Sequence, residues 1–117
     1  MVKQFPKRGE IYWVNLDPTV GSETQKTRPG LIISNDIGNE VSGVVIIAPI
    51  TSKIKGVFPF EVSLLVKDRD GKDKRGKAML NQCRAIDKSR LKEKISEADP
   101  EAVKAVDEAI KIVFAVT

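Results

Sequence analysis

The 117-residue sequence contains no histidine and only one cysteine, Cys83. Without histidine the chain lacks the usual acid/base side chain of neutral pH, and a Ser-His-Asp triad is excluded. A single cysteine cannot form an internal disulfide, and without histidine beside it no ordinary zinc site is left. We therefore expect no metal and no other cofactor, so any chemistry has to use other side chains.

Long apolar runs are missing as well. The longest, residues 44–48, is far shorter than the roughly 20 residues that cross a bilayer. No basic and then apolar leader precedes Pro6. These features predict a cytoplasmic protein without a membrane segment, and the length suits a single domain over residues 1–117.

Aromatic residues are few, with one Trp, one Tyr and four Phe, whereas charged residues are plentiful. Lys and Arg number 20 against 16 Asp and Glu, which gives a net charge of +4. A positive balance favours polyanionic partners through counterion release.

Short runs of branched and aromatic residues, separated by turn residues, predict five strands. The predicted strands are 9–16, 31–34, 44–48, 60–66 and 78–86. The glycines and asparagines of 35–43 predict a turn, and the charges of 67–77 predict a solvated hairpin. We also expect a short helical turn over 88–91, capped by Asp87, and a brief strand over 94–96.

The end of the sequence predicts one amphipathic helix. Asp99 can cap it, Pro100 suits its first position, and Glu101 follows in the first turn. An apolar stripe at helical spacing continues from there: Val103, Val106, Ile110, Val113 and Phe114. Together, the elements predict a mainly β fold with helical additions, in the form of a small barrel with a C-terminal α-helix.

A polar stretch that ends in Arg28-Pro29-Gly30 and enters the apolar residues 31–33 is the first candidate site. Pro29 favours extended backbone at Arg28, and Gly30 adds conformational freedom. Arg28 is therefore predicted on an ordered loop at a strand entrance, where binding and catalytic groups often lie.

Further polar groups stand at other strand ends. Thr51 and Ser52 follow the third predicted strand, and Asn81, Gln82 and Arg84 lie on the fifth. Such a set suits phosphoryl chemistry on RNA, in which the ribose 2′-hydroxyl attacks and the protein orients it and neutralises the developing charge.

In that chemistry Arg28 would present a planar fork to two phosphate oxygens. It cannot be the base because a guanidinium stays protonated. A carboxylate such as Glu23, or a bridged water, would have to accept the 2′ proton.

Three blocks occur in one order along the chain: RGEIYWVNLDPTVGSETQKTRPGLIIS near the N-terminus, PITS at 49–52 and NQCRAIDKSRL at 81–91. In this order and spacing the sequence resembles the MazF/PemK family of toxin endoribonucleases. The resemblance implies an SH3-like barrel of the CcdB/PemK type that forms a homodimer. It also implies metal-independent, sequence-specific cleavage of single-stranded RNA to 2′,3′-cyclic phosphate and 5′-hydroxyl ends, and control by a MazE-like antitoxin.

The family's functional residues map onto this sequence one by one. Arg28 matches the arginine of its TRP motif, Thr51 the threonine of its PIT motif and Glu23 the glutamate of its GSE motif, so these three are the predicted catalytic residues. Where many relatives have an Asp-Gln pair, this chain has Asn81 before Gln82, so a mechanism that needs that aspartate does not carry over. The residues predicted to bind RNA are Lys26, Thr27, Ser52, Lys53, Asn81, Gln82 and Arg84.

Two other functions stay open at this point. Gyrase-poisoning toxins share the expected fold but use a tryptophan near the C-terminus, whereas the only tryptophan here is Trp13. A non-catalytic RNA-binding barrel would also fit the positive charge, although such modules usually stack bases on several exposed aromatic side chains.

Overall fold

The fold is known from a computed structural model, which describes residues 4–17 and 27–117. Within these ranges the chain forms seven strands, two α-helices and two short 3-10 helices. The strands are β1 Glu10–Asn15, β2 Thr27–Ile32, β3 Val44–Thr51, β4 Glu61–Lys67, β5 Asp73–Met79, β6 Arg84–Asp87 and β7 Leu91–Glu97. The helices are α1 Asp36–Val41, η1 Leu80–Gln82, η2 Lys88–Arg90 and α2 Pro100–Phe114.

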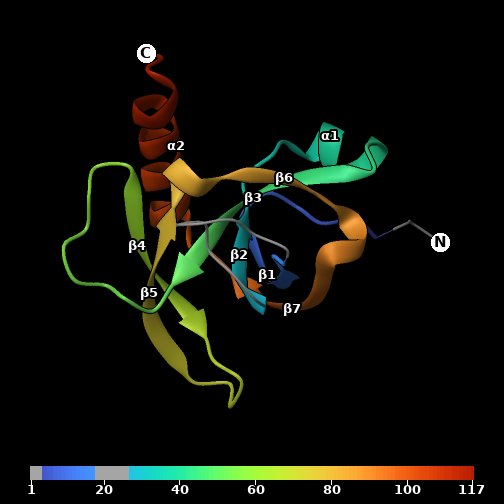
Figure 1. The fold of residues 1–117 in the computed structure, drawn as a ribbon, viewed down its shortest axis with the longest axis horizontal. Coiled ribbons are helices and arrows are strands. Elements are labelled where there is room, and N and C mark those ends of the chain that lie inside the picture. The colour runs from blue at the N-terminus through green and yellow to red at the C-terminus, as the bar shows by residue number, and fades with distance from the viewer. Residues whose placement is uncertain (1–3, 18–26) are drawn as a thin grey trace.

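All strands join one antiparallel sheet, in the order β4-β5-β3-β2-β1-β7, with β6 also paired to β3. The sheet forms a half-barrel, α2 lies beside β4, and the β4–β5 hairpin extends away from the other strands (Figure 1). The predicted fold class, mainly β with a C-terminal helix, is confirmed.

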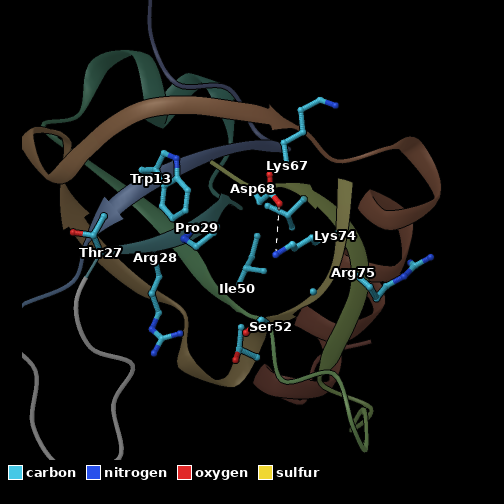
Figure 2. A pocket seen from close by; sticks show the side chains of 13 residues that line it. Trp13, Thr27, Arg28, Pro29, Ile50, Ser52, Lys67, Asp68, Lys74 and Arg75 are labelled. Atoms are coloured by element: carbon cyan, nitrogen blue, oxygen red, sulfur yellow. Dashed lines mark ion pairs between the residues drawn. The ribbon is translucent and has the colours of Figure 1, made fainter. Parts of the chain in front are cut away.

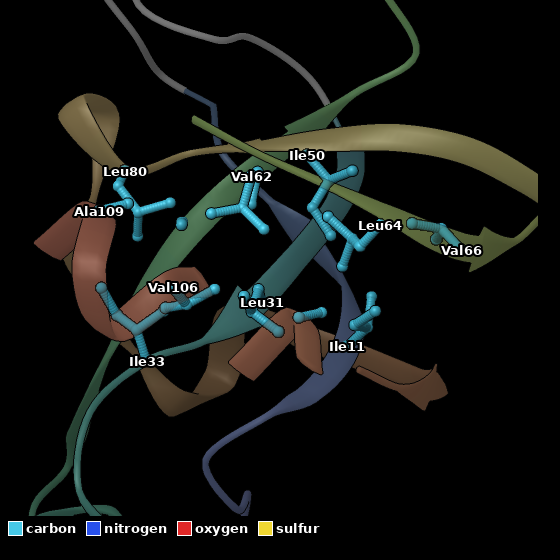
Figure 3. Close-up of a cluster of buried hydrophobic side chains, with 13 residues drawn as sticks. Ile11, Leu31, Ile33, Ile50, Val62, Leu64, Val66, Leu80, Val106 and Ala109 are labelled. Carbon is cyan, nitrogen blue, oxygen red and sulfur yellow. The ribbon is translucent and has the colours of Figure 1, made fainter. Parts of the chain in front are cut away.

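Two groups of buried side chains hold the sheet together. The larger lies between the sheet and α2, and Figure 3 shows Val106 and Ala109 of α2 directed toward Leu31, Ile33 and Leu80. The smaller lies on the other side of β1, β2, β3 and β6. Its members are Val14, Leu16, Ile32, Val45, Ile47 and Ile86. Burial of this apolar surface is the main term that stabilises the fold.

The helix α2 begins as predicted. The Asp99 carboxylate accepts a hydrogen bond from the Ala102 N–H at 2.8 Å, and Pro100 occupies the first turn. The buried face is centred on Ala102, Val106 and Ala109. Phe114, the last member of the predicted apolar stripe, lies at the exposed end of the helix with 58% of its surface accessible.

The turn predicted over residues 35–43 is wrong, since this segment contains the short helix α1. Asn35 caps that helix by accepting the Gly38 N–H at 2.8 Å. Asn39 is fully buried, and its Nδ2 donates to the Ser34 carbonyl at 2.9 Å. Side-chain capping and a buried amide therefore outweigh the turn propensity of the asparagines and glycines.

The solvated hairpin predicted over 67–77 is confirmed, because β4 and β5 pair in antiparallel fashion and residues 68–72 connect them. Charged side chains line a ribbon whose tip is open to solvent, and Lys67 pairs across it with Asp73 at 3.1 Å. Strand pairing therefore continues to Lys67 and Asp73, close to the tip of the hairpin.

The single strand predicted over 78–86 is interrupted by η1. Before the interruption, Ala78 pairs with Ile50 at one end of β3, and after it Arg84 pairs with Ile47 in the other half. The turn of 3-10 helix moves the chain from one ladder to the other. The helical turn capped by Asp87 is confirmed as η2, and the brief strand over 94–96 is part of the longer β7.

Candidate active site

The register of β2 and β3 brings the two main candidate residues together. Gly30 pairs with Pro49, and the same antiparallel register, continued by two residues, sets Arg28 opposite Thr51. Both strands are longer here than the sequence predicts, since β2 begins at Thr27 and β3 ends at Thr51. Residues opposite each other on antiparallel strands share one face of the sheet. Arg28 and Thr51 are therefore neighbours across two strands.

Both residues line a pocket of about 290 Å³. Its apolar side chains come from β1, β2, β3 and β4, and Trp13 is the largest of them (Figure 2). The lining residues are Trp13, Thr27, Arg28, Pro29, Ile50, Thr51, Ser52, Val66, Lys67, Asp68, Lys74, Arg75 and Gly76. Ile50 and Val66 also belong to the larger core cluster, so the pocket is the open end of that core.

The polar side chains of the pocket are mostly cationic. Among the lining residues within 4–17 and 27–117, four carry a positive charge, namely Arg28, Lys67, Lys74 and Arg75, and Asp68 is the only carboxylate. Asp68 lies 3.5 Å from the Lys74 ammonium. Hydrogen bonds from the Lys72 and Asp70 N–H groups, followed by the Lys74 charge, lower the pKa of Asp68, which is therefore ionised at neutral pH. The excess of positive charge favours an anionic ligand.

Thr51 is held firmly in this arrangement. Only 9% of its surface is accessible, and its Oγ1 accepts a hydrogen bond from the Lys53 N–H at 3.2 Å. A hydroxyl that accepts one hydrogen bond still carries its own donor. The arrangement can thus offer a guanidinium and a hydroxyl donor to one anionic group.

This chain resembles known proteins in both sequence and fold. Residues 7–114 match the family model described as PemK-like, MazF-like toxin of type II toxin-antitoxin system. The chain belongs to this toxin family. The resemblance predicted from the three sequence blocks is confirmed.

Individual relatives agree with the family match. The chain is 44% identical over 110 residues to endoribonuclease EndoA of Bacillus subtilis strain 168, covering 93% of this chain and 94% of that protein. Its fold is similar to MazF of Deinococcus radiodurans, with a TM-score of 0.78 at 30% identity over 97% of this chain and 100% of the other. A MazE–MazF crystal structure from the same organism matches with a TM-score of 0.73 at 26% identity, over 98% and 100% of the two chains.

The PemK-like toxin fold does not bring all the predicted residues to this pocket. Thr27, Arg28, Thr51 and Ser52 line it, and Lys53 follows them on the exposed surface. Glu23 and Lys26 lie outside the described residues. The structure leaves three other predicted residues, Asn81, Gln82 and Arg84, outside the pocket lining, on η1 and β6.

Two arginines contact the chain at the end of β1. Arg84 donates from Nη1 to the Leu16 carbonyl at 3.4 Å, and Arg90 donates to the Asn15 carbonyl at 3.1 Å. These bonds hold the backbone just before residues 18–26, the segment that contains Glu23. In the described part of the chain, Arg84 thus contacts the β1 backbone and does not reach the Arg28–Thr51 pocket.

Sequence reasoning missed several lining residues. Lys67, Lys74 and Arg75 lie in the segment predicted as a solvated hairpin, and Trp13 is predicted only as a strand residue. Strand alternation could have identified Trp13, because it shares a face with buried Ile11 and lies two residues closer to the strand end. A large aromatic residue just beyond a core position is a signal for a pocket wall.

Within residues 4–17 and 27–117, no three side chains among Cys, Asp and Glu form a group that could hold a metal ion. None of the described helices is both long and apolar enough to cross a membrane.

Proposed function

We propose that this protein is a toxin endoribonuclease that cleaves single-stranded RNA at short specific sequences, with Arg28 and Thr51 as its central catalytic pair. The observation that carries this proposal is that Arg28 and Thr51 line the same pocket, together with three further cationic side chains. The 44% identical relative is named an endoribonuclease, which supports the same reaction. No observation favours gyrase as a target.

In the proposed reaction the ribose 2′-oxygen attacks the adjacent phosphorus and the bond from phosphorus to the 5′-oxygen breaks. Arg28 binds two phosphate oxygens through its fork, and Thr51 donates a hydrogen bond to the charge that develops there. The 2′ proton passes to Glu23 or to a bridged water, and the departing 5′-oxygen takes up a proton. The products are a 2′,3′-cyclic phosphate and a 5′-hydroxyl, and no metal takes part.

We further propose that Lys26, Thr27, Ser52 and Lys53 contact the RNA near this pocket, and that Asn81, Gln82 and Arg84 contact it further along. The protein would act in the cytoplasm as a homodimer of one-domain chains. A MazE-like antitoxin would silence it, in keeping with the MazE–MazF complex of Deinococcus radiodurans. Acidic residues of such a partner would occupy the cationic rim in place of RNA phosphates.

The test is incubation with a mixed-sequence RNA in excess EDTA, followed by mapping of the cut ends. We expect recurrent cut sites, 5′ ends that a kinase can label directly, and 3′ ends that resist a ligase requiring a 3′-hydroxyl until the cyclic phosphate is opened and the resulting phosphate is removed. A substrate with a single 2′-deoxy sugar at the cut site should stay intact. The Arg28→Ala variant, purified in parallel, controls for contaminating nuclease. Activity that requires magnesium, or cleavage at the 2′-deoxy position, would refute the mechanism.

A further inference from the structure

Trp13 separates two pockets. It lines the pocket that contains Arg28 and Thr51, and it also lines a second pocket of about 250 Å³ together with Arg69. The Arg69 guanidinium lies 4.4 Å from the centre of the Trp13 ring. Because Arg69 lines only the second pocket, it supports the indole from that side. Within residues 4–17 and 27–117, the other side of Trp13 lines the first pocket.

The surroundings of Trp13 in the first pocket suit a flat, weakly polar group. Trp13 pairs with Pro29 across β1 and β2, and Ile50 and Val66 complete the apolar wall. A volume of about 290 Å³ is enough for one small ring system. Figure 2 shows Trp13 and Pro29 on one side of the space and Arg28 directed away from Trp13 at the rim. An apolar compartment and a cationic rim therefore adjoin each other.

We propose that Trp13 is a stacking platform for one nucleobase of the RNA, next to the phosphate that Arg28 binds. Aromatic side chains beside a cationic groove are the usual combination in single-strand nucleic-acid binding, where bases stack and phosphates bind the cations. The cation–π contact with Arg69 holds the indole in place and adds positive charge behind it. This inference rests on the proposed function, because it assigns a base-binding subsite to the same pocket.

The chain is well suited to a direct test because Trp13 is its only tryptophan. Intrinsic tryptophan fluorescence therefore reports on this one ring. The probes are single-stranded DNA decamers of mixed sequence, which lack the 2′-hydroxyl and so are not cut. A decamer of abasic sites with the same phosphates is the comparison. We expect the first set to quench the fluorescence, and the abasic decamer to bind roughly 5- to 150-fold more weakly, as one lost base–aromatic stack requires.

Variants separate stacking from mere packing. Trp13→Ala should raise KM for RNA roughly 5-fold or more, with kcat changed less than about threefold, whereas Trp13→Phe should retain most of the affinity. Phe114→Ala is the matched control, since it removes an exposed aromatic ring on α2, and it should leave KM unchanged. Urea midpoints check folding. If Trp13→Ala does not fold, the Trp13→Phe variant and the comparison of base-containing with abasic DNA still test whether a base stacks on Trp13.

Several outcomes would overturn the proposal. Equal binding of the base-containing and abasic decamers, or binding without a fluorescence change, would mean that no base reaches Trp13. Quenching by a synthetic peptide of glutamate and leucine, but by neither DNA, would assign the pocket to a protein partner instead. Failure of the wild type to cleave RNA would refute the proposed function, whereas the DNA experiment would still decide whether a base stacks on Trp13.

Discussion

The Lys77 ammonium lies 2.9 Å from the Glu61 carboxylate, and each side chain is less than a tenth exposed. The same Glu61 oxygen accepts the Phe58 N–H at 2.9 Å, while Lys77 is the strand partner of Thr51. This ion pair therefore connects β4 and β5 to the segment that follows β3, next to Thr51 of the proposed catalytic pair. The ion pair thus stabilises the part of the sheet that contains Thr51.

Removing either partner of the Lys77–Glu61 ion pair should destabilise the folded protein. Lys77→Met or Glu61→Gln alone should lower the free energy of unfolding by about 3–5 kcal/mol, because each leaves a buried charge without its partner. The double variant should recover at least half of the loss, since it buries no charge. Urea denaturation gives these values. Lys67→Met, which breaks an exposed pair on the same hairpin, is the control and should cost at most about 1 kcal/mol. If Lys77→Met, Glu61→Gln and Lys67→Met all lowered the free energy of unfolding equally, burial would not make the Lys77–Glu61 pair more important than an exposed pair.

A second prediction concerns Arg28 and Thr51, the proposed catalytic pair. Arg28→Ala should lower the cleavage rate constant about 100-fold or more, the scale of one lost oxyanion donor. Arg28→Lys should recover only part of it, because an ammonium lacks the planar fork. Thr51→Val removes the hydroxyl at nearly constant volume and should slow cleavage, whereas Thr51→Ser keeps the donor and should remain active. Single-turnover cleavage measures all four.

The control for charge is Lys104→Ala, which removes an exposed cation of α2 outside the pocket. It should leave the rate constant unchanged. Wild-type rates in Arg28→Ala and Thr51→Val would place the reaction elsewhere on the molecule.

The parts of the fold that could be predicted are those whose signals are local. The start of α2 follows from Asp99 and Pro100, and β1 from its branched and aromatic residues. The hairpin over 67–77 follows from its charges and glycines, whereas the residue at which β5 begins depends on cross-strand pairing with β4. The break at η1 depends on which part of β3 each half of the segment pairs with, and this is a long-range choice that composition does not encode.

The same division holds for the site. Arg28 and Thr51 were predicted as a pair, and the register of β2 and β3 explains why residues 23 positions apart line one pocket. Trp13 and the cations of β4 and β5 reach that pocket only because the sheet curves and the hairpin closes one side of it. Sequence motifs identify the proposed catalytic residues, whereas the walls of the pocket depend on the tertiary fold.

A third prediction tests how closely β5 approaches Ile50 and Thr51 at the end of β3. A Cβ at Gly76 would lie 2.9 Å from Ile50 Cγ2 and 3.1 Å from the Thr51 carbonyl oxygen. Gly76→Ala should therefore cost about 1–3 kcal/mol of stability, as overpacking does, and slow cleavage by displacing Thr51. Gly43→Ala is the matched control, because its Cβ meets nothing within 4 Å, and it should be neutral or slightly stabilising. Urea midpoints and cleavage rates of the two variants check this. A neutral Gly76→Ala would show that the strands can separate freely.

The last prediction concerns Tyr12, the only tyrosine of the chain. Burial and then the hydrogen bond from its hydroxyl to Glu10, at 3.0 Å, raise the pKa of Tyr12 to about 12. At pH 11 an ordinary tyrosine is about nine-tenths ionised, so phenolate absorbance at 295 nm should be low in the folded protein and high in urea.

The raised pKa of Tyr12 makes the stability of the folded protein depend on pH. The folded state favours the neutral phenol, so this contribution to stability is fully present below the ordinary pKa of about 10 and is lost as pH rises from there toward about 12. Glu10→Gln removes the carboxylate that repels a phenolate, and it should increase the ionised fraction at pH 11. Circular dichroism at the same pH confirms that the protein is folded during the measurement. A folded wild type with fully ionised Tyr12 at pH 11 would show that the phenol is neither buried nor bound to Glu10 in solution.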